Sequence, residues 1–166
     1  MAELSSQEYH LHGKWLESNG SAGERLNKAG VDFSGVELYG KKLDKANFAG
    51  ANFSKAKLVG TDFNGADLSG ANLSGSDCDG GEFKNANLSG ANLSGADFCG
   101  CQFDGVNLTK AICVGAKLPA ASFINGDLTD ADFSKADLDG ANLTGAKQGG
   151  LKLDGAAIRD IRGLVA

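Results

Sequence analysis

The sequence is poor in several features on which many proteins depend. Its 166 residues include one proline, one tryptophan and two histidines. It has no run of 18 apolar residues, so we expect no membrane-spanning helix. Its start, MAELSSQEYH, lacks the basic and apolar regions of a secretory signal peptide, which favours a cytoplasmic location.

Signals for catalysis and for cofactor or metal binding are also missing. No nucleophile–base pair can be placed around His10 and His12, the only histidines. The spacing of Cys99 and Cys101 does not fit a zinc site, and no GxxxxGKS/T phosphate loop occurs. Without a secretion signal, we do not expect a disulfide framework among the four cysteines. The sequence therefore predicts a protein that is not an enzyme, with no catalytic residue, no cofactor and no metal.

Glycine, with 25 residues, is abundant and lies in a strict repeat. From Val31 to Gly155 the chain divides into 25 consecutive blocks of five residues without an insertion, and a further block, 156–160, keeps the frame loosely. We call the third residue of each block its centre. All nine phenylalanines and 13 leucines are centres, and the four exceptions are Cys78, Cys113, Gln148 and Ile158.

A five-residue period matches neither a helix, which repeats near 3.6 residues, nor a strand, which repeats at two. Two residues before the centre, alanine is usual and can face the same side as the centre, while the Asp or Asn between them points outward. Two residues after the centre, glycine is usual and accepts a left-handed corner without a Cβ penalty. We therefore predict an all-β solenoid, in which successive corners turn the chain into coils stacked around an apolar core.

The block ANLSG at residues 71–75 resembles the pentapeptide-repeat family, and the resemblance extends over residues 31–160. It implies a right-handed, quadrilateral parallel β-helix with four blocks per coil. The residues alone do not decide this number, because identical centres recur about as often at a spacing of 15 as at 20. At a spacing of 20, two internal columns are expected: Phe63, Phe83, Phe103 and Phe123, and beside them Leu68, Leu88, Leu108 and Leu128.

The two ends of the repeat region are expected to be capped. Ser5 and Glu8 have capping-box spacing, so residues 1–30 are expected to be a short helix, about 6–17, and a loop, 18–30. The repeat solenoid is expected over 31–160 and a C-terminal cap segment over 161–166. Gln148 breaks the core column, and four later apolar residues have a helical spacing that suits covering the last coil or meeting a second copy: Ile158, Ile161, Leu164 and Val165.

Charge is distributed unevenly along the chain. Residues 61–140 have a net charge of −8, against +1 for 1–60 and +2 for 141–166, and direct nucleic-acid binding is not expected from such an acidic chain. One branch of the resembled family, the Qnr-type quinolone-resistance proteins, resembles duplex DNA in shape and charge and occupies the DNA site of gyrase. A spacing of 20 gives one mostly acidic row that is interrupted by lysines: Glu37, Lys57, Asp77, Asp97, Lys117 and Asp137.

Outward positions are mostly polar, so outward apolar residues are informative. With four blocks per coil, three of them lie on successive corners of one coil: Val114, Pro119 and Ile124. Cys99 lies directly below Pro119, and Ile112 lies two residues before Val114. We hypothesise an interaction patch of Cys99, Ile112, Val114, Pro119 and Ile124, although scattered apolar surface residues need no such explanation.

These patterns favour a non-enzymatic, rigid scaffold for protein–protein interaction, with an unidentified protein partner and no contact with a membrane. A homodimer formed through one end or through the lateral patch is a further hypothesis. The alternative function is a DNA-mimicking modulator of DNA gyrase or topoisomerase, similar to the quinolone-resistance proteins.

Overall fold

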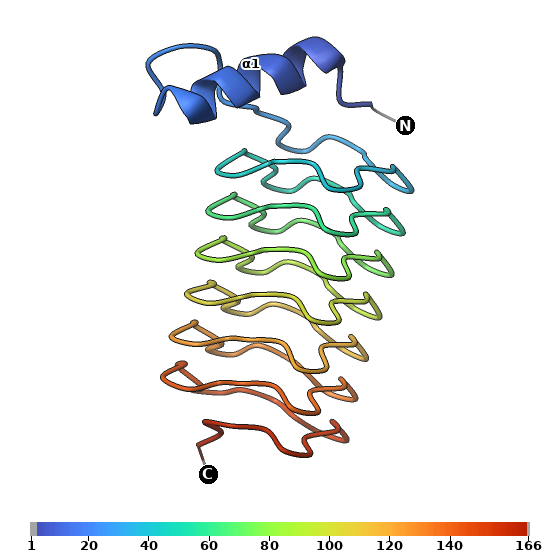
Figure 1. Cartoon of the computed structure of the whole chain (residues 1–166). Helices are drawn as coiled ribbons and strands as arrows, with labels where there is room; N and C mark the ends of the chain where they lie inside the picture. The colour runs from blue at the N-terminus through green and yellow to red at the C-terminus, as the bar shows by residue number, and fades with distance from the viewer. Residues whose placement is uncertain (1–2, 166) are drawn as a thin grey trace.

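Every fifth residue from Asn27 to Arg162 forms a parallel β-bridge with the residue 20 positions away in a neighbouring coil. In the computed structural model, which describes residues 3–165, these bridges stack the chain into a rod of coils (Figure 1). Since each block has five residues, each coil has four blocks and four sides. The rod is a right-handed, quadrilateral parallel β-helix, as the resemblance implied, and the predicted fold is confirmed.

The sides of the rod are four ladders of bridging residues, which we number from the ladder of the first predicted block, 31–35. The first ladder begins at Asp32, the second at Glu37 and the third at Lys42, while the fourth begins at Asn27. Each strand is reduced to its one bridging residue, and the described residues contain no longer strand. Because the chain passes the four ladders in turn, the first and third ladders lie on opposite sides of the rod.

Backbone hydrogen bonds fix this register. The N–H of Leu68 donates to the carbonyl oxygen of Asn87 in the next coil at 2.7 Å, and the N–H of Asn87 donates back to Ala66 at 2.9 Å. At the corner between blocks, the N–H of Ala71 donates to the carbonyl oxygen of Leu68 at 3.0 Å. The same three contacts recur along the rod, so the backbone of an inner coil is paired with the coils on both sides.

The residue two positions after each centre turns the corner with a left-handed backbone. From Gly30 to Asp160, φ at this position lies between 55° and 73°. Most L-residues avoid this region because their Cβ approaches the following carbonyl oxygen, and glycine does not. This requirement explains why glycine dominates the position in the sequence.

The centres fill the interior of the rod. No phenylalanine or leucine centre between Phe33 and Leu143 is more than 4% exposed. The predicted phenylalanine column is present, with successive rings 5.0 to 5.3 Å apart between centroids and at most 18° from parallel: Phe63, Phe83, Phe103 and Phe123. The four leucines of the neighbouring column are at most 1% exposed. Function therefore has to use the outer surface or the ends of the rod.

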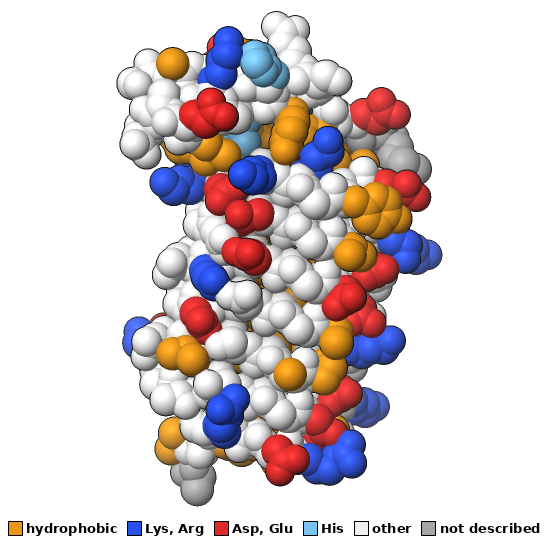
Figure 2. All heavy atoms as spheres, in the orientation of Figure 1, with side chains coloured by type: hydrophobic (Ala, Val, Ile, Leu, Met, Phe, Trp, Pro, Cys, Tyr) orange, Lys and Arg blue, Asp and Glu red, His pale blue; other side chains and the backbone are white. Residues whose placement is uncertain are grey.

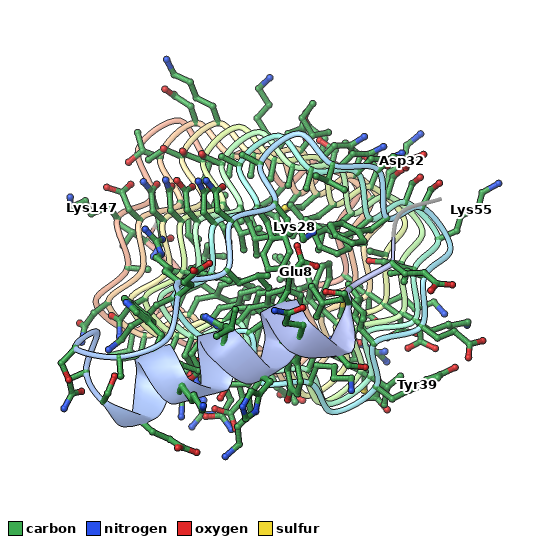
Figure 3. The ribbon with its side chains drawn as sticks, turned by 90° about the horizontal axis from the view of Figure 1, so that it is seen from above. Glu8, Lys28, Asp32, Tyr39, Lys55 and Lys147 are labelled. Carbon is green, nitrogen blue, oxygen red and sulfur yellow. The ribbon has the colours of Figure 1, made fainter. Side chains whose placement is uncertain are left out.

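One helix, α1 (Ser6–Glu17), lies across the N-terminal end of the rod (Figure 1). The predicted capping box is present, because the N–H of Glu8 donates to the Ser5 hydroxyl and the N–H of Ser5 donates to the Glu8 carboxylate, both at 3.2 Å. Glu8 also forms an ion pair of 2.6 Å with Lys28 of the first coil, and Figure 3 shows these two side chains pointing toward one another. No described helix is long and apolar enough to cross a membrane.

The bridges extend beyond the boundaries drawn from the sequence. They begin at Asn27, inside the segment expected to be a loop, where Leu26 is 4% exposed at the position usually held by alanine. They end at Arg162, whose N–H donates to the carbonyl oxygen of Ala141 at 2.9 Å. The helical spacing of the last apolar residues was misleading: among residues 3–165 no helix forms there, and Ile158 and Ile161 continue the five-residue frame.

Gln148 leaves the core and holds the C-terminal segment. Its side-chain nitrogen donates to the carbonyl oxygen of Gly163 at 2.7 Å, and its side-chain oxygen accepts from the N–H of Val165 at 3.0 Å. Leu164, between these two contacts, is half-buried against the core. The residue that interrupts the apolar column therefore serves to fold the last residues back toward the final coil.

The positions of Leu88 and Asn87 predict opposite responses to substitution. Leu88→Asp places an unpaired carboxylate in a fully buried column, and we expect it to abolish cooperative folding. Asn87→Ala removes outward contacts with Asp67 and Ser89, and we expect a loss of about 1 kcal/mol or less. Thermal unfolding followed by circular dichroism checks both, and similar effects of the two substitutions would contradict the assigned block frame.

Candidate interaction surfaces

Two clefts flank α1 where it crosses the first coil. One, of about 560 Å³, is lined among others by Leu4, Tyr9 and Val36, and the other, of about 700 Å³, by Tyr9, Leu16 and Asp44. Tyr9 separates them: its hydroxyl accepts from the N–H of Lys42 at 3.2 Å and its ring lies 4.6 Å from a lysine nitrogen of the same coil. Both clefts are open and belong to the contact between the cap and the coil.

The structure separates the five residues of the hypothesised lateral patch. Pro119 and Ile124 lie on the two corners that border the third ladder, and Cys99 lies one coil before Pro119. Ile112 belongs to the first ladder, on the opposite side of the rod, with Val114 on the following corner. Ile112 is 46% exposed and Cys99 is also exposed, whereas Val114, Pro119 and Ile124 are half-buried. Val114 and Pro119 lie on the two corners that border the second ladder, so the five residues spread over several sides of the rod and do not share one face.

Apolar side chains also follow one edge of the rod. The corner after the second ladder presents Tyr39, Val59, Cys99 and Pro119 in successive coils, with Asp79 between them. Tyr39 is 53% exposed. Figure 2 shows apolar side chains along this edge alternating with acidic and basic ones. The edge is convex and mixed in charge, which leaves no continuous apolar surface along it.

The C-terminal end of the rod is more open than the N-terminal end. Ile158, at a centre position, is 39% exposed and Val165 is 71% exposed, whereas centres in the middle coils are at most 1% exposed. Among the described residues, the N–H groups of Leu153 and Ile158 have no hydrogen-bond acceptor, whereas the same groups of the inner coils donate to the residue 19 positions later. This end therefore combines exposed apolar side chains with unpaired backbone groups.

The acidic rows are interrupted by basic residues of neighbouring coils. In the second ladder Lys57 contacts Asp77 at 3.2 Å and Lys117 contacts Asp97 at 3.3 Å. Beside it, Asp139 forms an ion pair with Arg159, and hydrogen bonds from this arginine lower the pKa of the Asp139 carboxyl. The negative charge of the middle coils is thus partly balanced within the row predicted to be acidic.

A carboxylate cluster lies below α1 at the third ladder, where Figure 2 shows acidic side chains gathered. Asp62 and Glu82 are bridge partners, and the corner residue Asp44 lies beside Asp62. Partial burial, followed by the nearby carboxylates of Asp44 and Glu82, raises the pKa of Asp62 to about 6, although a hydrogen bond from the N–H of Asn64 opposes the shift. The cluster was not predicted from the sequence. Its signal there is a spacing of 18 residues, which places a corner residue beside a ladder residue of the next coil; Asn64 likewise donates to the Glu82 carboxylate, 18 residues later, at 2.8 Å.

The cysteines are free thiols, and three of them are buried. Burial raises the pKa of Cys78 to about 12, and burial raises the pKa of Cys101 and Cys113 as well. A thiol that stays protonated is a poor nucleophile and a poor metal ligand. Within residues 3–165, no group of three His, Cys, Asp or Glu side chains is placed to hold a metal ion.

Comparison with known proteins identifies the repeat. The sequence model of a family described as "Pentapeptide repeats" matches in eight copies, over residues 29–65, 66–105, 86–123 and 111–147. No curated protein matches the chain.

Solved structures with similar folds include three pentapeptide-repeat or resistance proteins. QnrB1, a plasmid-mediated fluoroquinolone resistance protein, is 21% identical with a TM-score of 0.45, over 80% of this chain and 89% of that one. HetL from the cyanobacterium Nostoc sp., involved in heterocyst differentiation regulation, is 19% identical with a TM-score of 0.43, over 93% and 98%. A protein of the Arabidopsis thaliana thylakoid lumen is 30% identical with a TM-score of 0.27, over 68% of each chain. With these TM-scores, the family assignment rests on the sequence model.

Because the pKa of Asp62 is raised, we predict that a neutral residue at this position stabilises the fold more at high pH than at low pH. The folded pKa, about 6, exceeds the ordinary 3.8, so the carboxyl destabilises the fold increasingly as pH rises through 6. Asp62→Asn keeps the shape and an acceptor for Asn64. After allowance for solvent screening of a partly exposed group, we expect it to raise the free energy of unfolding by about 0.5 kcal/mol at about pH 7.5 and by little at about pH 4.5.

Urea denaturation at the two pH values measures this difference. Asp67→Asn is the matched control, because Asp67 belongs to the fourth ladder and its accepting oxygen already binds Ser69 and Asn87. An equal or larger gain at the lower pH for Asp62→Asn would contradict the proposed repulsion between the three carboxylates.

Proposed function

The chain belongs to the pentapeptide-repeat family, and from that premise we propose that it is a rigid scaffold for protein–protein interaction and not an enzyme. The filled interior supports this most directly, because a rod whose centres are almost completely buried offers a ligand only its outside and its ends. The stacked coils change shape little without breaking backbone ladders, which suits holding partners at fixed positions.

We propose the C-terminal end as the main contact surface and a second copy of this chain as its occupant. Exposed Ile158 and Val165 give this end apolar area, and a further backbone edge would supply protein acceptors to the N–H groups of Leu153 and Ile158. Two identical ends facing one another across a twofold axis would cover the apolar side chains and would also supply a backbone edge. The end also has charges of both signs, from Asp154, Asp160 and Arg162, so self-contact need not bring only like charges together.

The lateral residues remain a second proposed contact for a protein partner. Ile112 is 46% exposed on the first ladder with Val114 next to it, while Cys99, Pro119 and Ile124 border the third. Each group is small, and scattered apolar side chains are ordinary on protein surfaces. We therefore rank the lateral contact below the contact at the end.

A DNA-mimicking modulator of gyrase is the alternative function, favoured by the net charge of −8 over residues 61–140. A groove that binds duplex DNA expects regularly spaced negative charges. Lys57 and Lys117 interrupt the second ladder and pair with its aspartates, which weakens that match. A supercoiling assay with purified gyrase tests this alternative, and no effect at micromolar protein would remove it.

Charge substitution at the C-terminal end is expected to prevent self-association. Ile158→Lys combined with Val165→Lys places two charges at the exposed end, beyond the last fully buried centres, so folding should be kept. We expect the unmodified chain to form a dimer at micromolar concentration and the variant to be at least about tenfold weaker in association, equivalent to about 1.4 kcal/mol. Sedimentation velocity with light scattering measures both.

The matched control is Ile112→Asp combined with Val114→Asp, which changes the lateral group and leaves the end intact. If only this control weakens the dimer, the lateral surface is the contact and the end is not. A monomeric unmodified chain at all accessible concentrations would overturn self-association through either surface.

A further inference from the structure

His12 joins α1 to the first coil through a buried contact. It is the one fully buried residue of the helix, with 0% of its surface exposed. Its Nδ1 accepts a hydrogen bond of 3.1 Å from the N–H of Leu26, the first core residue of the rod. Its ring stacks on Trp15, with centroids 5.9 Å apart and planes 12° from parallel. The imidazole is therefore part of the contact that holds the cap on the coil.

This contact requires the neutral imidazole. A ring nitrogen that accepts a hydrogen bond carries no proton, so the single proton of His12 must lie on Nε2. Nε2 is buried and has no hydrogen-bond partner among the described residues. Adding a second proton would turn Nδ1 into a donor facing the Leu26 N–H, which is also a donor. The protonated ring would lose the hydrogen bond from Leu26 and carry a charge in a buried site.

We propose that His12 is a proton-operated latch, which releases α1 from the first coil in mild acid while the coils below remain folded. The neutral ring closes the latch by accepting from Leu26, and the imidazolium opens it by leaving the site for water. The ion pair between Glu8 and Lys28 tethers the other half of α1 and limits the release to a hinged opening.

The groups around His12 come from three elements, two of which supply a charge. Burial lowers the pKa of His12 and Arg25 of the connecting segment adds to this, while Asp44 of the first coil opposes it. The ring neighbour on α1 itself is Trp15, which is uncharged. Asp44 also faces Asp62, whose raised pKa of about 6 keeps its carboxyl largely uncharged in mild acid, so Asp62 adds little negative charge near an imidazolium at His12.

The pKa values of His12 and Asp62 are shifted in opposite directions, so the cap and the coils respond differently to pH. His12 has a lowered folded pKa, so the unfolded or undocked cap binds more protons, and docking weakens as pH falls below the ordinary value of 6.5. Asp62 has a raised folded pKa of about 6, so the coils gain stability as pH falls through that value. Mild acid therefore acts in opposite directions on two adjacent parts of one molecule.

Hydrogen exchange resolved by residue tests the latch on the full chain. After correction for intrinsic exchange rates, we expect protection of the Leu26 amide and of α1 to fall by at least about fivefold between about pH 7.5 and about pH 5, since one pKa unit corresponds to a tenfold change. Amides of the middle coils, such as Leu88, should keep their protection. A parallel loss of protection in cap and rod would mean acid unfolding of the whole molecule and would overturn the proposal.

His12→Asn supplies the decisive variant, because its side-chain oxygen can replace Nδ1 as an acceptor and cannot become charged. We expect its cap protection to change less than about twofold over the same pH range, after the same correction. His10→Asn, on the exposed side of the same helix, should retain the pH dependence of the unmodified chain. A pH dependence that persists in His12→Asn would overturn the latch.

A titration of the two histidines by nuclear magnetic resonance keeps the test informative if His12→Asn fails to dock at either pH. In the unmodified chain, His12 should be the Nε2-protonated tautomer at neutral pH and should titrate below the ordinary value of 6.5. Its titration should coincide with loss of the Leu26 amide protection. A charged His12 in a cap that is still docked would contradict the proposal.

Discussion

The backbone ladders between residues 20 apart are the constraint on which the other features of the rod depend. Hydrogen bonds such as those joining Leu68, Asn87 and Ala66 hold each inner coil at one register relative to its neighbours. Each block position then points the same way in every coil, which stacks the phenylalanine rings inside and aligns charged residues outside. The left-handed corners make this register attainable, and glycine meets their backbone requirement at the lowest cost.

The ends of the rod differ from its middle because a terminal coil lacks one neighbour. Polar side chains provide part of the missing contacts there: His12 and Glu8 hold the helix at one end, and Gln148 holds the last residues at the other. A contact between apolar columns does not respond to pH, whereas a buried imidazole does. The middle coils are thus suited to rigidity, and the ends are suited to association and regulation.

Much of the fold could be read from the block pattern, and the errors have physical causes. The centres, the outward positions and the capping box of Ser5 and Glu8 follow from local chemistry, and the structure has them all. The number of blocks per coil could not be derived from the residues, because identical centres recur nearly as often at a spacing of 15 residues as at 20. The C-terminal apolar residues suggested a helix because Ile158 and Ile161 satisfy a helical spacing and the five-residue frame at once.

The sequence by itself determined which side chains of the middle coils are buried, since a period of five with one large apolar residue per block leaves one consistent frame. Only the tertiary structure decided which outer residues meet. It set Asp44 beside Asp62 and brought His12 against Leu26. These contacts depend on how many blocks complete a coil and on where the cap docks. Both are set by packing between distant segments, which no local pattern encodes.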